Sequence, residues 1–125
     1  MSIDIDNVLT EDVLKGLRNP VLDDARGLPA AIYTSEEFFA AEQKSLFPST
    51  WMCIAFDSQV PKAGDAVPLT VLGLPMLLSR DRSGQVHVLH NVCRNRATIV
   101  VEKPCSGQQN FKCPYHGWTY DLDGS

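Results

Sequence analysis

The chain of 125 residues lacks an excess of basic residues, a long apolar run and a basic leader. Its formal net charge of −4 excludes the strongly basic surface that nucleic-acid-binding proteins present. No apolar run approaches the roughly 20 residues that a membrane-spanning helix needs. Residues 1–10 are acidic and do not have the basic-then-apolar order of a signal peptide. We therefore expect a cytoplasmic protein that binds neither nucleic acid nor a membrane.

Cysteine is also scarce, with four residues at positions 53, 93, 105 and 113. No export signal accompanies these cysteines, and a reducing compartment keeps thiols free for metal binding. Apolar residues make up 44% of the chain and charged residues 21%, which is ordinary for one small globular domain with a modest core. We expect free thiols rather than disulfides.

The N-terminal third favours helices. Thr10 precedes two acidic residues, which is typical of a capped helix start. A second helix is predicted over 35–47, with Thr34 as its cap and Glu37 completing a capping box. The stretch 21–31 has little pattern and is expected to be extended.

From residue 51 onward the sequence changes to short runs of β-forming residues separated by turn residues. Closely spaced strands of this kind are typical of an antiparallel sandwich or a barrel-like domain. The last residues resemble the turn of a hairpin whose return strand is absent, so we expect a fragment of a larger domain. The predicted strands are 51–56, 67–72, 75–80, 85–91, 110–112 and 118–122.

Two short segments carry the residues that suit a metal. Cys93 lies in the first segment, and Cys113 and His116 lie in the second. Thiolate and imidazole are ligands for soft and borderline metals. The spacing Cys113-x-x-His116 fits a tight loop, in which proline fixes the shape and the following glycine lets the backbone pass close to a metal.

These two segments resemble the two ligand loops of a Rieske [2Fe–2S] domain, in which Cys-x-His is followed by Cys-x-x-His. The 17 residues between Asn95 and Cys113 fit the separation of the two loops in that family. Residues 113–124 are nearly identical to the second loop of ring-hydroxylating oxygenase alpha subunits, and the resemblance covers about residues 29–124. Further family markers are Gly64-Asp65, Gly73-x-Pro75, Arg80 and Asn91.

The resemblance implies a mostly β fold: a Rieske-type antiparallel β-sandwich with an N-terminal helical lead-in, incomplete at its C-terminus. The lead-in would occupy residues 1–33 and the truncated Rieske domain residues 34–125. In a Rieske centre two cysteines hold one iron and two histidines hold the other, which raises the reduction potential. The resemblance therefore assigns Cys93 and Cys113 to the first iron and His116 to the second.

The resemblance also implies partners. The Rieske domain of an aromatic-ring-hydroxylating oxygenase accepts electrons from a ferredoxin or a reductase. It passes them to a mononuclear Fe(II), held by two histidines and a carboxylate in a second domain. Such subunits often form trimers. This chain contains no such triad, so by itself it is expected to carry electrons and not to oxygenate a substrate. The helical lead-in favours an oxygenase over a free-standing Rieske ferredoxin.

Asn95 departs from the family, which has histidine at this position. Asparagine offers a carbonyl oxygen, a poor ligand for iron beside sulfide. Three outcomes stay open: a labile cluster completed by water or the Asn95 oxygen, a neighbouring histidine as substitute, or a cluster-less Rieske-fold binding domain. A single zinc ion held by Cys93, Cys113, His116 and one more donor is a further alternative.

The remaining candidates favour structural roles. His87 and His90 lie on opposite faces of one predicted strand, so at most one faces a cluster. We expect both to be framework residues, Cys105 to be a small loop residue, and Cys53 to lie in the core.

Three further residues lie in or beside the two loops. Arg94 and Arg96 are either solvated charges or contacts for an acidic partner surface. Trp118 is expected to pack beneath the second loop.

Overall fold

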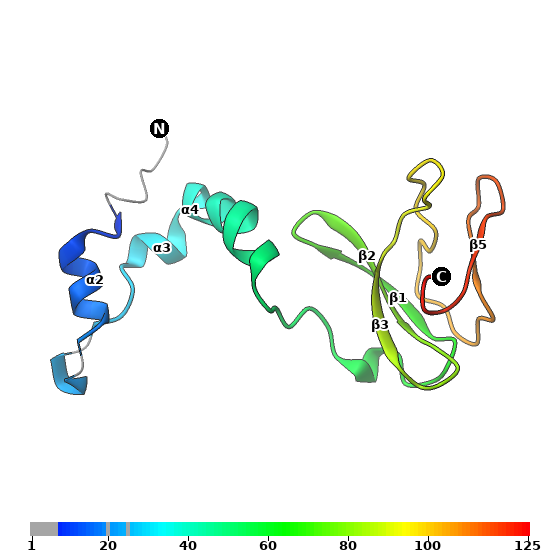
Figure 1. Cartoon of the computed structure of the whole chain (residues 1–125), viewed down its shortest axis with the longest axis horizontal. Coiled ribbons are helices and arrows are strands. Elements are labelled where there is room, and N and C mark those ends of the chain that lie inside the picture. The colour runs from blue at the N-terminus through cyan, green and yellow to red at the C-terminus, as the bar shows by residue number, and fades with distance from the viewer. Residues whose placement is uncertain (1–7, 20, 25) are drawn as a thin grey trace. The chain divides into compact units, whose positions relative to one another are not determined.

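The structure, a computed structural model of the chain, describes residues 8–19, 21–24 and 26–125. The chain divides into two compact units, which we call the helical unit, up to Met52, and the β unit, Cys53–Ser125 (Figure 1). The predicted division into a lead-in over residues 1–33 and a Rieske domain over residues 34–125 stays a prediction. None of the helices in the described part of the chain combines the length and apolar character that crossing a membrane requires.

The first helix of the helical unit begins as the sequence predicts. Its cap is Thr10, whose Oγ1 accepts a hydrogen bond from the Val13 amide at 3.4 Å. The prediction of an extended stretch over 21–31 is wrong, because a short 3₁₀ turn and the start of a further helix lie there. The elements are α2 (Glu11–Leu17), η1 (Leu22–Asp24), α3 (Ala30–Thr34), α4 (Glu36–Ala41), η2 (Glu42–Leu46) and η3 (Phe47–Ser49).

The second predicted helix differs from the prediction at both ends. Its cap is Ser35, whose Oγ accepts from the Phe38 amide at 3.0 Å, and not Thr34. Thr34 is instead the last residue of α3, and its hydroxyl donates to the Ala30 carbonyl within that helix at 3.1 Å. The helix is also not uniform: α4 continues as the π-helical turn η2 and then as the 3₁₀ turn η3, which contains Pro48. A proline cannot donate to the preceding turn, and tightened last turns are common at helix ends.

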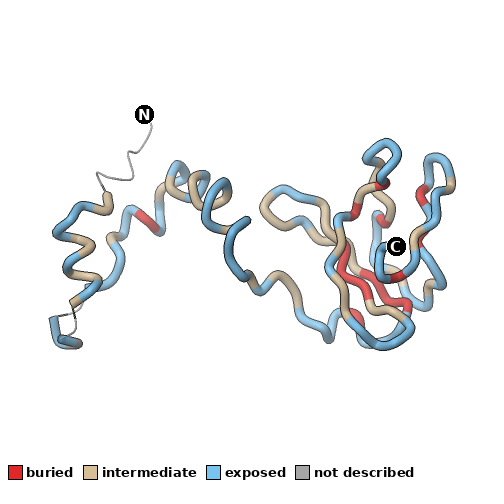
Figure 2. The backbone as a smooth tube through the Cα atoms, in the orientation of Figure 1, coloured by how far each residue is buried: buried red, intermediate tan, exposed pale blue. Residues whose placement is uncertain are grey.

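Burial is sparse in the helical unit. Among its described side chains only Ile32 is buried, and Figure 2 shows this single buried segment. Tyr33, Phe39 and Leu46 are large apolar residues that remain exposed. Packing within this unit is therefore shallow.

The β unit is built on a three-stranded antiparallel sheet with strand order β1-β2-β3. A short antiparallel hairpin, β4-β5, follows it. Five of the predicted strands are confirmed, and the mostly β, antiparallel fold class is confirmed with them. The strands are β1 (Ala66–Val71), β2 (Leu74–Arg80), β3 (Val86–His90), β4 (Phe111–Lys112) and β5 (Thr119–Tyr120).

The strand predicted over 51–56 is wrong. These residues form no strand in the described structure, and the chain turns into the 3₁₀ helix η4 (Asp57–Gln59). The side-chain oxygen of Gln59 accepts from the Phe56 amide at 2.9 Å, which fixes the start of that turn. Cys53 is exposed, so its predicted place in the core is also wrong. A run of β-forming residues needs a partner strand to become a strand, and here the described residues supply none.

The core of the β unit lies between the sheet and the segments that follow it. Ser79 is fully buried, and its Oγ donates to the Leu122 carbonyl at 2.8 Å, which ties β2 to the last turn. Cys105 is partly buried against the core and forms an isolated bridge with Ala66, in agreement with the prediction of a small framework residue. The buried cluster consists of Ala66, Leu77, Val101, Phe111 and Leu122.

Candidate metal centre

The first cluster loop comprises residues 93–98. Two backbone hydrogen bonds close it: the Ala97 amide donates to the Cys93 carbonyl at 2.8 Å, and the Cys93 amide donates to the Thr98 carbonyl at 2.8 Å. Ala97 has a φ of 52°, in the left-handed region that normally favours glycine. The loop is therefore a tight turn that both backbone groups of Cys93 close.

The second cluster loop, residues 113–118, has the same backbone frame. The Gly117 amide donates to the Cys113 carbonyl at 3.0 Å, and the Cys113 amide donates to the Trp118 carbonyl at 2.7 Å. Gly117, with φ of 75°, occupies the place that Ala97 occupies in the first loop. The two cysteines therefore hold equivalent positions in two similar turns.

Different elements hold the two loops. The side chain of the buried Asn91 donates to the Val101 carbonyl at 2.7 Å and accepts from the Val101 amide at 3.0 Å, which fixes the base of the first loop. The second loop connects β4 and β5, where Phe111 pairs with Tyr120. Figure 1 shows the two loops projecting side by side from one end of the β unit.

The two cysteines lie at the base of the loops and are buried, with 3% of Cys93 and 2% of Cys113 exposed. The Tyr120 hydroxyl lies 3.2 Å from Cys93 Sγ, and it accepts from the Arg94 amide at 3.0 Å. The hydrogen bond from Tyr120 lowers the pKa of the Cys93 thiol, and the backbone amide of Asn95 lowers it further. The same bond raises the pKa of Tyr120. Both directions favour the Cys93 thiolate, which is the form that binds metals.

The remaining two candidates meet at the exposed loop tips. The Asn95 amide nitrogen lies 3.1 Å from Nδ1 of His116. The Tyr115 ring stacks on the His116 imidazole with the centroids 3.9 Å apart, and the Arg96 guanidinium lies 5.9 Å from the Tyr115 centroid. The structure therefore pairs the four predicted site residues in two layers: Cys93 with Cys113, buried at the loop bases, and His116 with Asn95 at the exposed loop tips.

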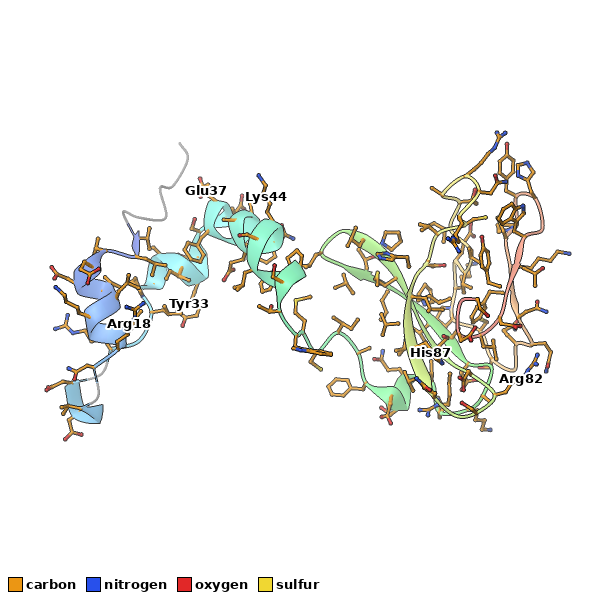
Figure 3. The ribbon with its side chains drawn as sticks, viewed as in Figure 1. Arg18, Tyr33, Glu37, Lys44, Arg82 and His87 are labelled. Carbon is orange, nitrogen blue, oxygen red and sulfur yellow. The ribbon has the colours of Figure 1, made fainter. Side chains whose placement is uncertain are left out.

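Neither of the other histidines joins this group. His87 Nε2 lies 2.8 Å from an Asp81 carboxylate oxygen, and Figure 3 shows His87 at the end of the β unit away from the loop tips. Hydrogen bonds from Ser83 and His87 hold the pKa of Asp81 well below its ordinary value of 3.8. His90 pairs with Met76 in the sheet, and its side chain is exposed. These positions favour framework roles and give no support to a substitute histidine ligand.

The four residues can be compared with the donors that a two-iron cluster requires. Among the residues that the structure describes, no three His, Cys, Asp or Glu side chains gather around one ion position. A [2Fe–2S] cluster of the Rieske type needs two thiolates at one iron and imidazoles at the other, so its donors are spread over two metals. Cys93, Cys113 and His116 meet three of these four requirements, and Asn95 does not meet the fourth.

Sequence reasoning missed one residue of the site and misjudged another. Tyr120 lies seven residues beyond Cys113, and no sequence pattern indicates that its hydroxyl reaches Cys93 in the other loop. Trp118 was expected beneath the second loop, but half of its surface is exposed. Its backbone carbonyl, and not its ring, closes the loop.

The sequence profile of the Rieske [2Fe-2S] domain matches residues 50–125. The N,N-dimethyl phenylurea N-demethylase subunit alpha of Sphingobium sp. (strain YBL2) is 38% identical over 98 residues, which are 78% of this chain and 21% of that protein. A quaternary ammonium Rieske monooxygenase, whose structure bears on carnitine oxidation and inter-subunit electron transfer, matches with a TM-score of 0.67 at 30% identity. The match covers 78% of this chain and 27% of that one.

Naphthalene 1,2-dioxygenase from Rhodococcus sp. also matches with a TM-score of 0.67 at 30% identity, over 90% of this chain and 26% of that one. The chain therefore spans about a quarter of the length of the relatives it matches. The profile match covers more than half of the chain. On this basis the chain belongs to the Rieske [2Fe-2S] domain family, and it corresponds to the electron-transfer part of Rieske oxygenase alpha subunits.

Proposed function

We propose that this chain holds a [2Fe–2S] cluster, with Cys93 and Cys113 at one iron and His116 at the other, and relays electrons within an oxygenase. The observation that carries the proposal is the meeting of two similar cysteine turns, one of which also presents an imidazole. A bound cluster of this type takes up and releases one electron at a time.

The buried and the exposed residues of the site have different roles in this proposal. The buried loop bases shield the thiolates of Cys93 and Cys113 from water, and Tyr120 supports the thiolate of Cys93 through its hydroxyl. His116 lies at the exposed loop tip, beside Tyr115, so this edge of the site is the short route for an electron to or from a partner.

The electron donor is proposed to be a ferredoxin or a reductase. Arg94 and Arg96 are both exposed at the tip of the first loop, in a chain whose formal net charge is −4. Two cations beside the electron-entry edge suit an acidic protein surface, because complementary charge steers association.

The electron acceptor is proposed to be a mononuclear iron in a further domain of the whole oxygenase, within a homo-oligomer such as a trimer. The similarity to the monooxygenase with inter-subunit electron transfer supports this arrangement. The relatives include an N-demethylase of a dimethyl phenylurea, a quaternary ammonium monooxygenase and an aromatic dioxygenase. This chain matches about a quarter of each of them, so the proposal concerns that part, and for the whole oxygenase it names only small organic substrates in general.

The test is the iron and acid-labile sulfide content of anaerobically purified chain, with an electron paramagnetic resonance spectrum after dithionite reduction. We expect iron and sulfide in equal amounts and a Rieske-type signal. The matched variants are Cys113→Ser, which should lose both, and Cys105→Ser, which should keep both because Cys105 is a framework residue. Equal contents in the two variants would contradict the proposal.

A second candidate is a cluster-less binding domain of Rieske fold. The hydrogen bond between Asn95 and His116 favours it, because that bond satisfies both side chains without a metal. In this case the purified chain would be folded and would contain neither iron nor labile sulfide. The same assay therefore distinguishes the two candidates.

A further inference from the structure

The loop bases hold two neighbouring thiols. Tyr120 pairs with Phe111 across the β4-β5 hairpin, and its hydroxyl lies 3.2 Å from Cys93 Sγ. The hairpin pairing continues past β4, where the Cys113 amide donates to the Trp118 carbonyl at 2.7 Å. Because side chains alternate along a strand, Cys113 lies on the same face of the hairpin as Phe111 and Tyr120. The Cys113 thiol shares a hydrogen-bonding contact with the Cys93 thiol, although 19 residues separate the two cysteines in the chain.

The loop tips and the loop bases differ in what their side chains still lack. At the tips the Asn95 amide nitrogen lies 3.1 Å from His116 Nδ1, so these two side chains satisfy each other. At the bases Cys93 and Cys113 are free cysteines. In the described part of the chain, no third His, Cys, Asp or Glu side chain joins them around one ion position. Two adjacent thiols have one chemistry that needs no third donor, which is oxidation to a disulfide.

We infer that Cys93 and Cys113 are a dithiol redox pair, which a small, neutral peroxide converts to a disulfide in the metal-free chain. The inference does not rest on the proposed function, because neither iron nor sulfide takes part. Only 3% of Cys93 and 2% of Cys113 are exposed, so hydrogen peroxide suits this position better than a bulky oxidant such as glutathione disulfide. A disulfide sulfur is no longer a thiolate, so the oxidised pair does not bind a metal until it is reduced.

The reaction consumes one peroxide for each pair of thiols. The sulfur of Cys93, which is hydrogen-bonded to the Tyr120 hydroxyl, attacks a peroxide oxygen. A sulfur–oxygen bond forms, the oxygen–oxygen bond breaks, and water leaves a sulfenic acid behind. The sulfur of Cys113 then attacks the Cys93 sulfur, so that the disulfide forms, the sulfur–oxygen bond breaks and a second water leaves. Each cysteine sulfur loses one electron, the peroxide gains two, and the two thiol protons end in the two waters.

The fold, and not closeness in sequence, selects this pair. Cys105 lies only eight residues before Cys113 and would be its favoured partner in an unfolded chain, because shorter loops close at a lower entropic cost. In the structure Cys105 instead bridges Ala66 and packs against the core of the β unit. A disulfide between Cys93 and Cys113 is therefore specific to the folded chain.

The test is treatment of the full wild-type chain with hydrogen peroxide, after a chelator has removed metal and the reductant has been washed out. The remaining thiols are then alkylated, and the chain is digested with trypsin for mass spectrometry. Cleavage after arginine and lysine places Cys93 on peptide 83–94 and Cys113 on peptide 113–125. We expect these two peptides to be joined by a disulfide, and dithiothreitol should separate them again.

Two comparisons show whether the fold directs the reaction. A sample oxidised in urea should join peptide 113–125 mainly to peptide 97–112, which carries Cys105. Cys105→Ser is the matched control and should form the native link as wild type does. In Cys113→Ser the second thiol is missing, so the sulfenic acid at Cys93 should persist and be trapped by dimedone.

The outcomes separate this inference from the proposed function. If the folded wild-type chain joined Cys113 to Cys105, or kept both Cys93 and Cys113 as free thiols while the exposed Cys53 was oxidised, the inference would be overturned. Neither result changes the iron and acid-labile sulfide content of anaerobically purified chain, so the proposed function is tested independently. The decisive measurement uses the wild-type chain, so it does not depend on how well a variant folds.

Discussion

The two cluster loops share a backbone and differ in their side chains. Both place a cysteine at the start and close with the same two hydrogen bonds, and both turn at a positive φ, at Ala97 in one and Gly117 in the other. The second loop presents the histidine and the glycine that such a turn favours. The first loop presents Asn95 and an alanine in a conformation that disfavours a Cβ atom.

The two loops differ in their side chains alone, because the same pair of backbone hydrogen bonds closes each of them. Backbone hydrogen bonds and the buried Asn91 hold the first loop in place, and none of these contacts involves the Asn95 side chain. We therefore expect loop shape to be independent of the side chain at position 95.

Exchanging the side chains at the loop tips should have the largest effect. Asn95→His should raise the iron and sulfide content toward two of each per chain, because it supplies the missing imidazole. His116→Asn should reduce both contents to background, because no imidazole is then left at the second iron. Metal and sulfide analysis of protein purified in parallel checks both variants. No gain from Asn95→His would mean that the ligand change does not limit assembly.

The second loop and the β strands were predictable from sequence because their signals are local. The Cys113-x-x-His116 spacing, and turn residues between short β-forming runs, report directly on backbone geometry. The contact of Tyr120 with Cys93 was not predictable, because it joins two loops whose relative position only the folded sheet determines. The hydrogen bond between Asn95 and His116 depends on the same juxtaposition.

The part of the chain before the sheet gave weaker predictions for a related reason. Thr34 and Ser35 both offer a hydroxyl at a helix start, and sequence alone does not reveal that Thr34 is the last residue of α3. Residues 51–56 resemble a strand, yet pairing decides whether such a run becomes one. In both places the outcome depends on residues outside the local run: α3 already contains Thr34, and residues 51–56 have no partner strand among the described residues.

Exchanging the turn residues should shift stability in opposite directions. Ala97→Gly should stabilise the chain and Gly117→Ala should destabilise it, each by about 1 kcal/mol, because a Cβ atom in the left-handed region is strained. An added Cβ at position 117 would lie 3.2 Å from the Cε atom of the flexible Lys112, so backbone strain and not a clash dominates. Urea unfolding of the cluster-free protein measures both. Equal effects of the same sign would show that the two turns are not equivalent.

Removing the Tyr120 hydroxyl should lower the reduction potential of the cluster, because this hydroxyl is hydrogen-bonded to the Cys93 sulfur. In Tyr120→Phe the loss of a hydrogen bond to Cys93 removes about 1 kcal/mol of support for the more negative, reduced cluster, which lowers its potential by about 40 mV. A spectroscopic redox titration of cluster-loaded protein checks the value. Tyr33→Phe is the matched control, because Tyr33 is exposed in the helical unit. An unchanged potential in Tyr120→Phe would mean that its hydroxyl does not support the thiolate.

The smallest effect is expected at Asp81, which lies in the turn between β2 and β3 and belongs to neither loop. Its substitution tests whether that turn influences the shape that the two loops share. Its pKa is depressed by hydrogen bonds from Ser83 and His87. A depressed carboxyl pKa stabilises the fold above the unfolded value, here about 3.8, and this contribution disappears as pH falls below that value toward the folded pKa.

Asp81→Asn should therefore lower the urea midpoint at pH 7, and the difference from wild type should shrink as the pH falls below 4. Asp57→Asn is the control, because Asp57 is 81% exposed and lies 3.9 Å from Arg80. Its midpoint should change little at either pH. Asp81→Asn should also leave the contrast between Ala97→Gly and Gly117→Ala intact. If Ala97→Gly and Gly117→Ala no longer changed stability in opposite directions when combined with Asp81→Asn, the turn between β2 and β3 would help to hold the two loops in their shared shape.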